Sequence, residues 1–254
     1  MSAPQRQQAI GLMCAALCWG VGACHRAGDK PPDNAASPPK TGIERVKKPA
    51  APLVPASYKS WGSAHFRVFA PMQSGDDAAE VLQILEAARL ALAQKIDGTG
   101  FSLDAGPGVE VILYAATGDF TAATGRPWWT AAATSGATIE MQPCAVLRAR
   151  RALATTLRHE YVHAVLASVG RGTLPRWLNE GLALHFAGEG TALPTAIPIL
   201  PRAALENAVA APATPEALRA SYAAAYQETQ RLIKTQGESR VWRLALSGAD
   251  IPEV

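Results

Sequence analysis

Cysteine is scarce in this sequence, and its distribution excludes a disulfide framework. Only four cysteines occur in 254 residues, and Cys14 and Cys18 lie within an apolar N-terminal segment that Cys24 ends. Beyond that segment Cys144 stands alone, so no internal disulfide can form there. We interpret Cys144 as a small buried residue, because no histidine stands at a spacing typical of a nucleophilic cysteine.

An excess of charge of one sign is also missing. The chain has 24 Lys and Arg against 21 Asp and Glu, a net charge of +3, and no basic patch alternates with aromatic residues. This pattern argues against a nucleic-acid partner. The basic residues Arg45, Lys47 and Lys48 are more typical of a solvated linker than of a binding site.

The N-terminal apolar run is too short for a membrane span, which needs about 20 residues. It covers residues 9–23, follows Arg6, and ends in Val-Gly-Ala-Cys at residues 21–24, a sequence that resembles the lipobox of bacterial lipoproteins. We therefore expect a signal peptide over residues 1–23 and an exported protein in the bacterial cell envelope, facing the periplasm or the exterior. Lipidated Cys24 would anchor it to the membrane. The alternative is an ordinary signal peptide that is cut near the same place.

The segment after the leader differs in composition from the rest of the chain. Residues 24–56 contain seven of the nineteen prolines and hardly any large apolar residues. Such a segment buries too little surface to fold, and its prolines favour an extended tether. We expect a flexible linker over residues 24–56 and one folded domain over residues 57–254.

Hydrophobic periodicity in that domain places strands before helices. Period-two or continuous apolar patterns predict strands over 63–71, 108–116 and 137–143. Helical spacing predicts helices over 76–97, 150–169, 174–188, 201–210, 215–236 and 239–247. The helix over 150–169 is apolar almost all round, which is typical of a central, buried helix. The pattern predicts an α+β fold with a small N-terminal α/β lobe, a helical C-terminal lobe and a cleft between them.

The predicted central helix carries an HExxH pattern within "TLRHEYVHAVL" (residues 156–166). His159 and His163 are four residues apart, so they project from one face of a helix and can bind one metal ion. Glu160 would then lie beside the open coordination position. Tyr161 points away from that face and is expected in the core. HExxH alone is weak evidence, so a third ligand is required.

Glu180, in "WLNEGLALHF" (residues 177–186), is the candidate for that ligand. It follows His163 by seventeen residues, enough for a loop and a reversal of chain direction. Its neighbours are apolar and would penalise an unpaired carboxylate, whereas a metal ion would remove the penalty. The alternative is a solvated helix carboxylate. His185, about 140° further round the helix, is interpreted as a packing residue.

Together, "LRHEYVHAVL" and "LPRWLNEGLALHFAG" resemble the gluzincin metallopeptidases, in particular the bacterial peptidase MA-like group. The resemblance extends loosely over residues 60–247 and is specific only over 156–188. It implies a zincin-like fold and one Zn²⁺ per chain, held by His159, His163 and Glu180. It also implies that Glu160 is the general base and acid, and that the substrate is a peptide or protein.

The resemblance points to further residues and includes one departure. Tyr222 is implied as the donor to the oxyanion and Tyr226 is the second candidate, although either tyrosine could simply belong to the core. Asn179 matches the residue before the ligand glutamate in many relatives. Relatives often place an acid four residues after that glutamate to support a ligand histidine, but here the residue is Leu184. Residues 139–142 are expected to present backbone groups to an extended substrate.

A zinc ion with a neighbouring carboxylate is suited to peptide-bond hydrolysis. The sequence therefore predicts a zinc metallopeptidase of the cell envelope. The main alternative is a catalytically weak or inactive zinc-binding scaffold or peptide-binding lipoprotein, but such a protein would not need Glu160. A further alternative is a lipoprotein with a chance HExxH, for which Glu180 and its flanks would also have to be coincidence. Nothing in the sequence indicates the oligomeric state.

Overall fold

The computed structural model describes residues 52–106, 108–195, 197–210, 212 and 214–252. The predicted signal peptide over residues 1–23, Cys24 and residues 25–51 of the predicted linker lie outside these residues. Within the described part of the chain, no helix combines the length and apolar character that a membrane crossing requires.

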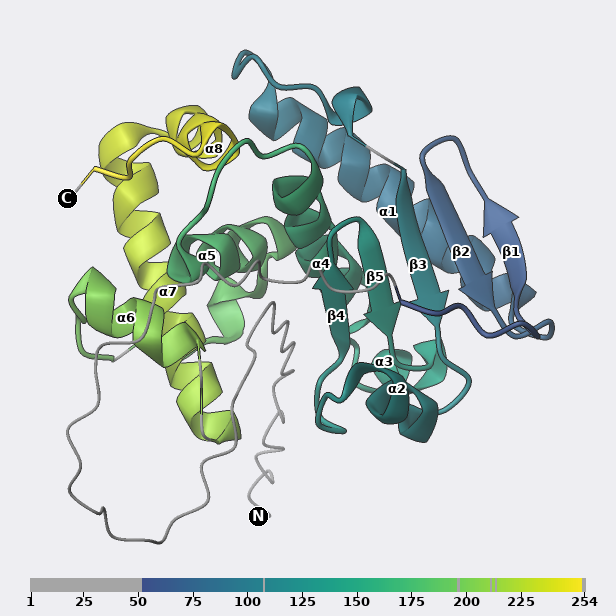
Figure 1. The fold of residues 1–254 in the computed structure, drawn as a ribbon. Coiled ribbons are helices and arrows are strands. Elements are labelled where there is room, and N and C mark those ends of the chain that lie inside the picture. Colours follow the sequence, from purple (N-terminus) through teal and green to yellow (C-terminus); the bar gives the residue numbers. More distant parts are fainter. Residues whose placement is uncertain (1–51, 107, 196, 211, 213, 253–254) are drawn as a thin grey trace, which may run out of the picture.

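The architecture is a mixed α+β arrangement of a small five-stranded sheet and a helical body (Figure 1). The strands are β1 (Lys59–Gly62), β2 (Phe66–Ala70), β3 (Val109–Leu113), β4 (Ala132–Ser135) and β5 (Thr138–Met141). Their order in the sheet is β1-β2-β3-β5-β4. The inner pairs β2–β3 and β3–β5 are parallel, whereas β1 and β4 run antiparallel at the two edges.

The helical elements follow and interrupt these strands. They are α1 (Gly75–Ile96), η1 (Leu103–Ala105), α2 (Thr117–Thr124), α3 (Cys144–Ala149), α4 (Leu153–Ser168), α5 (Arg176–Ala187), η2 (Glu189–Ala192), α6 (Arg202–Ala210), α7 (Pro215–Gln236) and α8 (Glu238–Ser247). From α5 onward the described chain contains no strand, as the sequence pattern predicts.

Alternating side chains of β3 show how the sheet is covered on both faces. Val111 and Leu113 join the main core, to which α1 and α4 contribute, while Ile112 joins a smaller cluster with Phe120 of α2. Successive residues of a strand point to opposite faces. A strand segment that is buried on both faces reads as a continuous apolar run, which explains why the run Val111–Leu113 of β3 is recognisable from the sequence.

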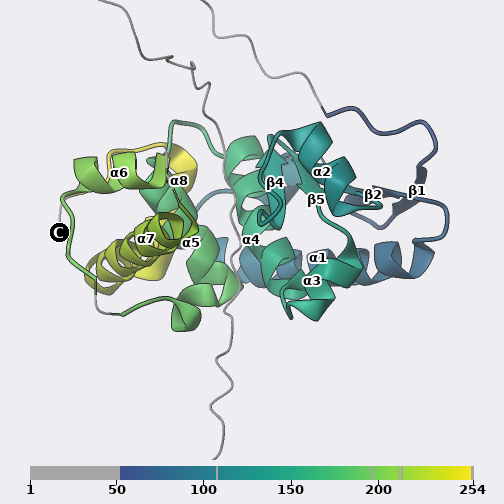
Figure 2. The same cartoon turned by 90° about the horizontal axis from the view of Figure 1, so that it is seen from below.

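Helix α4 lies between the sheet and the helical body (Figure 2). It contacts α1, β4 and β5 on one side and α5 on the other. Eleven of its sixteen residues are buried. This agrees with the prediction of a central helix that is apolar almost all round, and it brings the HExxH residues to the junction of the two parts.

The structure corrects the predicted elements in three places. The helix predicted over 150–169 begins only at Leu153, because the backbone turns into the left-handed region at Arg151 (φ 55°). Strands β1 and β4 and helices α2 and α3 were not predicted. The strand over 137–143 was expected to meet substrate, but β5 is paired on both sides, with β3 and β4. The edge strand on that side is β4, so this prediction was wrong.

Candidate metal centre

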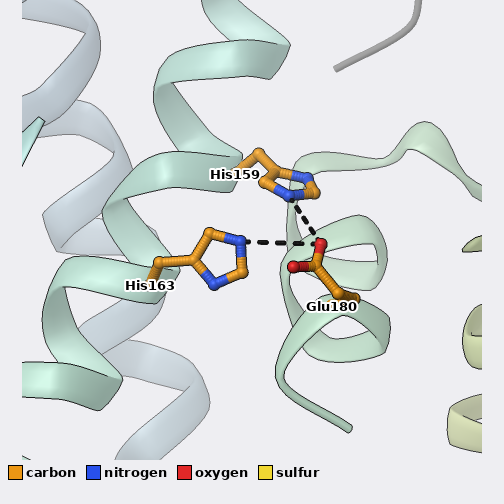
Figure 3. Close-up of side chains that lie close together, drawn as sticks. All are labelled: His159, His163 and Glu180. Atoms are coloured by element: carbon orange, nitrogen blue, oxygen red, sulfur yellow. Dashed lines mark ion pairs between the residues drawn. The ribbon is translucent and has the colours of Figure 1, made fainter. Parts of the chain in front are cut away.

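Two helices bring three ligand atoms together. His159 and His163 come from successive turns of α4, and Glu180 comes from the middle of α5 (Figure 3). The Nε2 atoms of the histidines lie 3.4 Å and 3.7 Å from Oε2 of Glu180. All three ligand atoms lie within 4.8 Å of one another. This buried group could hold a metal ion.

The hydrogen-bonding state of these atoms tests whether a metal fits. His159 Nε2, His163 Nε2 and Glu180 Oε2 are buried, and none of them has a hydrogen-bond partner. Buried polar atoms without partners are costly, so three in one place need a common explanation. Two imidazole nitrogens and one carboxylate oxygen form the ligand set that zinc takes in hydrolases. A zinc ion would satisfy all three atoms at once.

The far nitrogen of each imidazole is held by a side-chain oxygen. His159 Nδ1 lies 3.0 Å from Oε1 of Glu189, and His163 Nδ1 lies 2.9 Å from Oδ1 of Asn179. Because both partners are acceptors, each Nδ1 donates its proton and leaves the Nε2 lone pair facing the other ligands. The protein therefore fixes both rings in the tautomer that a metal requires.

Glu189 is a functional candidate that the sequence reasoning missed. In the gluzincins that the sequence resembles, such an acid often stands four residues after the ligand glutamate, but here that position holds the buried, apolar Leu184. Helix α5 ends at Gly188 in the left-handed conformation (φ 77°), and η2 starts at the next residue. This turn brings Glu189 back to His159. An acidic residue directly after the glycine that ends the ligand helix is the signal that could have revealed it.

The charges around His159 favour a cation. Burial alone would lower the pKa of His159, but Glu189 and Glu180 outweigh it and raise that pKa well above its ordinary value. Two carboxylates face one imidazole that is fully buried. The negative field that favours a proton on this ring also favours a divalent metal ion.

Glu160 lies in the same buried region and is anchored by the sheet. Its Oε2 accepts a hydrogen bond of 2.6 Å from Thr134 Oγ1 on the edge strand β4. Burial raises the pKa of Glu160 above its ordinary value, although His163, His159 and the bond from Thr134 act in the opposite direction. A carboxyl group with a raised pKa is suited to accepting and returning a proton near neutral pH. Thr134 was not a sequence candidate, because its strand was not predicted.

The two candidate tyrosines occupy different places on α7. The ring of Tyr222 is buried and lies nearly parallel to that of His159, with 6.4 Å between centroids. Tyr226 lies against η2, where a β-carbon on Gly190 would come within 2.0 Å of its ring. The structure therefore brings Tyr222 to the candidate metal centre and Tyr226 to the segment beside it.

Two other sequence candidates lie away from the three ligands. His185 belongs to a separate network in which Nε2 lies 3.0 Å from Glu238 Oε1 and Nδ1 lies 2.8 Å from Gln230 Nε2. Cys144 is buried at the start of α3, and burial raises the pKa of its thiol to about 12. Both residues fit the structural interpretations that the sequence favoured.

Comparisons with known proteins give little further information. No protein-family model and no curated protein matches the sequence. Among solved structures, yeast LTA4 hydrolase in complex with bestatin is similar with a TM-score of 0.45 and 12% identity, covering 76% of this chain and 34% of that chain. Native leukotriene A4 hydrolase from Saccharomyces cerevisiae gives 0.45 and 13%, with 74% and 32% covered. This chain thus spans about a third of the length of each, and at these values the likeness assigns neither a fold family nor an activity.

Proposed function

We propose that this protein is a zinc metallopeptidase of the gluzincin type, with a zincin-like fold, that hydrolyses peptide bonds. One observation carries the proposal: three buried ligand atoms without hydrogen-bond partners converge beside a buried glutamate. A structural zinc site would be closed by a fourth protein ligand. In the described residues the group has three, and the HExxH glutamate is retained next to them.

The residues of the chain would divide the chemistry among them. His159, His163 and Glu180 would hold the zinc ion, which when bound polarises a carbonyl group and acidifies water. Glu160 would accept a proton and return it to the leaving amine. Thr134 donates a hydrogen bond to Oε2 of Glu160. No described group donates to Oε1, and we therefore assign proton transfer to Oε1. Tyr222 is the proposed donor to the developing oxyanion.

The proposed location follows from the sequence of the leader. A lipidated Cys24 would tether the domain through residues 25–56 to a membrane of the bacterial cell envelope. The full-length protein should then sediment with membranes and partition into detergent. The Cys24→Ala variant should be released or keep its leader. Equal fractionation of the two forms would remove the lipid anchor from the proposal.

The metal is tested first, on the full-length protein. The purified chain should contain one zinc ion, and His163→Ala or Glu180→Ala should lose most of it, because two ligands bind zinc far more weakly than three. Metal analysis of each variant measures this, with the exposed Glu216→Ala as control. Unchanged zinc in Glu180→Ala would remove that residue from the ligand set.

Glu160→Gln separates catalysis from metal binding. The substitution keeps the size of the side chain and leaves the three proposed ligands in place, so zinc content and thermal stability should stay near those of the wild type. Hydrolysis of casein or of a random peptide library should fall by about 10²–10⁴, the usual contribution of a general base. The control is Glu216→Gln. If the wild-type protein binds zinc but cleaves no more than Glu160→Gln, a zinc-binding scaffold becomes the better interpretation.

A further inference from the structure

A cavity lies on the side of α4 that faces away from the candidate metal centre. Its volume is about 500 Å³, within the range of small-molecule sites. Tyr161, Val165 and Ser168 of α4 line one wall, while the start of β2 and part of α1 line others. Residues two positions apart on a helix point in nearly opposite directions. Tyr161 therefore faces away from His159 and His163, and the cavity is separate from the candidate metal centre.

The inner wall carries a hydroxyl group that the protein does not use. Tyr161 is only 2% exposed, and its ring packs edge-on against Phe66 with 5.4 Å between centroids. Its hydroxyl makes no hydrogen bond to any described residue and is open to the cavity rather than enclosed by protein. Burial raises the pKa of Tyr161, so the hydroxyl keeps its proton and remains a donor.

A guanidinium group with unused donors lines the same cavity. The side chain of Arg89, on α1, is 12% exposed and also lines the cavity. In the described structure only its Nη2 is engaged, by Asp104 of η1. Asp104 is the exposed partner of this pair, with 75% of its side chain accessible, so the carboxylate of a ligand can compete with it for the guanidinium group. Arg89 and Tyr161 thus both contribute donors to the lining of this cavity.

The other charged groups at the cavity are paired with one another. His65 Nδ1 lies 2.8 Å from Glu86, and Arg67 lies 4.0 Å from Glu110. The buried apolar part of the lining includes Phe66, Val165 and the ring of Tyr161. Next to the unused donors, the cavity thus offers an apolar wall.

We propose that this cavity binds a carboxylate that carries an apolar or aromatic group. The Tyr161 hydroxyl and the Arg89 guanidinium donate to the carboxylate, and Phe66 and Val165 contact the apolar part. A small carboxylic acid and the free C-terminus of a peptide share this chemistry. The site does not depend on the proposed metal chemistry, since it lies on the other face of α4.

Calorimetric titration of the full-length chain tests the proposal with four probes. These are N-acetyl-phenylalanine, its amide, and a short peptide ending in phenylalanine with a free or an amidated C-terminus. The titrations are repeated on His163→Ala, so that binding through a metal ion is excluded. Each acid should bind roughly tenfold or more tightly than its amide, because charged acceptors make the stronger hydrogen bonds. Tighter binding of N-acetyl-phenylalanine identifies a small carboxylic acid as the ligand, and tighter binding of the peptide acid identifies the free C-terminus of a peptide. Equal binding of acids and amides overturns the proposal, as does no binding.

Three substitutions then locate the site. Tyr161→Phe keeps the ring and its packing, and should weaken acid binding by roughly 10- to 100-fold, as should Arg89→Gln. Asp104→Asn removes the competing carboxylate and should tighten acid binding by up to about fivefold. Arg240→Gln, which is exposed, is the control and should bind like the wild type. Weaker binding in Asp104→Asn, or unchanged binding in both Tyr161→Phe and Arg89→Gln, overturns the assignment. Unchanged melting temperatures show that the variants are folded.

Discussion

At the scale of single residues, the two imidazoles of the candidate metal centre differ in the oxygen that holds them. His163 donates to the neutral amide of Asn179, whereas His159 donates to the carboxylate of Glu189. A carboxylate acceptor increases the basicity of the imidazole more than an amide does, and therefore its strength as a ligand. Both acceptors also set the orientation of their rings. Glu189 lies outside both HExxH and the segment of α5 that carries Glu180, yet we expect it to contribute to metal affinity.

Glu189→Ala should weaken zinc binding by about 10- to 100-fold, the usual effect of removing such a partner. Glu189→Gln keeps an oxygen acceptor for His159 Nδ1 and should lose less. Competition with a chromogenic zinc chelator measures the affinities of the full-length variants. Glu216→Ala, at an exposed position of α7, should bind like the wild type. Wild-type affinity in Glu189→Ala would show that another group fixes His159.

The residues that the sequence could predict are those whose spacing is local. The i, i+4 pair on α4 and the buried carboxylate on α5 come together as expected. Thr134 reaches the site because strand β4 lies against α4. Glu189 reaches it because the chain turns back at Gly188, where α5 ends. No periodicity in the sequence connects either residue to α4. Such contacts follow from the three-dimensional path of the chain, so the sequence pattern alone could not supply them.

At the scale of elements, the orientation of Glu180 depends on how closely α5 packs against α7. The next residue, Gly181, sits where the helices are in contact. A β-carbon there would lie 1.9 Å from Oγ1 of Thr229 and 2.7 Å from the backbone oxygen of Ala225. Both distances are well below van der Waals contact. Glycine is therefore needed at this position for close approach of the two helices.

Gly181→Ala should destabilise the protein by about 1–3 kcal/mol or more, the usual cost of overpacking a core. It should also weaken zinc binding, because α5 carries Glu180. Adding Thr229→Ala should recover only part of the loss, since the oxygen of Ala225 remains in the way. Urea unfolding measures the effect. Gly118→Ala in α2, where a β-carbon meets nothing within 4 Å, is the matched control and should be neutral or slightly stabilising. Equal stability of the two variants would contradict the packing argument.

The elements themselves were predictable where the apolar pattern is long. Helices α1, α5 and α7 begin and end within about two residues of their predicted bounds, because many apolar positions define each period. Strand β4 reads Ala-Ala-Thr-Ser, which has little β-propensity, so it was missed. The break at Arg151 was also missed, because the left-handed conformation is uncommon for a residue other than glycine.

At the scale of the whole molecule, the last helix ties the sheet-bearing part to the helical part. Trp242 of α8 is fully buried, and Arg243 donates to the backbone oxygen of Gly98, just after α1. Arg171, in the α4–α5 loop, donates its backbone N–H to Leu246. The main core of buried residues runs through both parts. We therefore expect the described domain to unfold as one cooperative unit, with the contacts of α8 among those that couple its two parts.

The carboxylate of Glu238 is the electrostatic component of this connection. Its two oxygens lie 3.0 Å from Lys95 Nζ on α1 and 3.0 Å from His185 Nε2 on α5. Burial acts to raise the pKa of Glu238, but the hydrogen bonds from Lys95 and His185 outweigh it and lower that pKa below its ordinary value. A carboxyl group with a lowered pKa in the folded state stabilises the protein in its ionised form.

Stability should consequently depend on pH through Glu238. Its contribution is fully present above the pKa of a glutamate in the unfolded chain, about 4.3, and is lost as the pH falls through the lower pKa of the folded state. The wild type should thus be more stable than Glu238→Gln at pH 7, and the difference in free energy of unfolding should shrink as the pH falls below about 4.3. Urea unfolding of both proteins at pH 7 and at pH 3 measures this difference. Asp250→Asn, whose carboxylate is exposed after the end of α8, should differ little from the wild type at either pH. A gap between wild type and Glu238→Gln that stays constant down to pH 3 would mean that α8 is held to α1 and α5 by packing alone, without help from this charge.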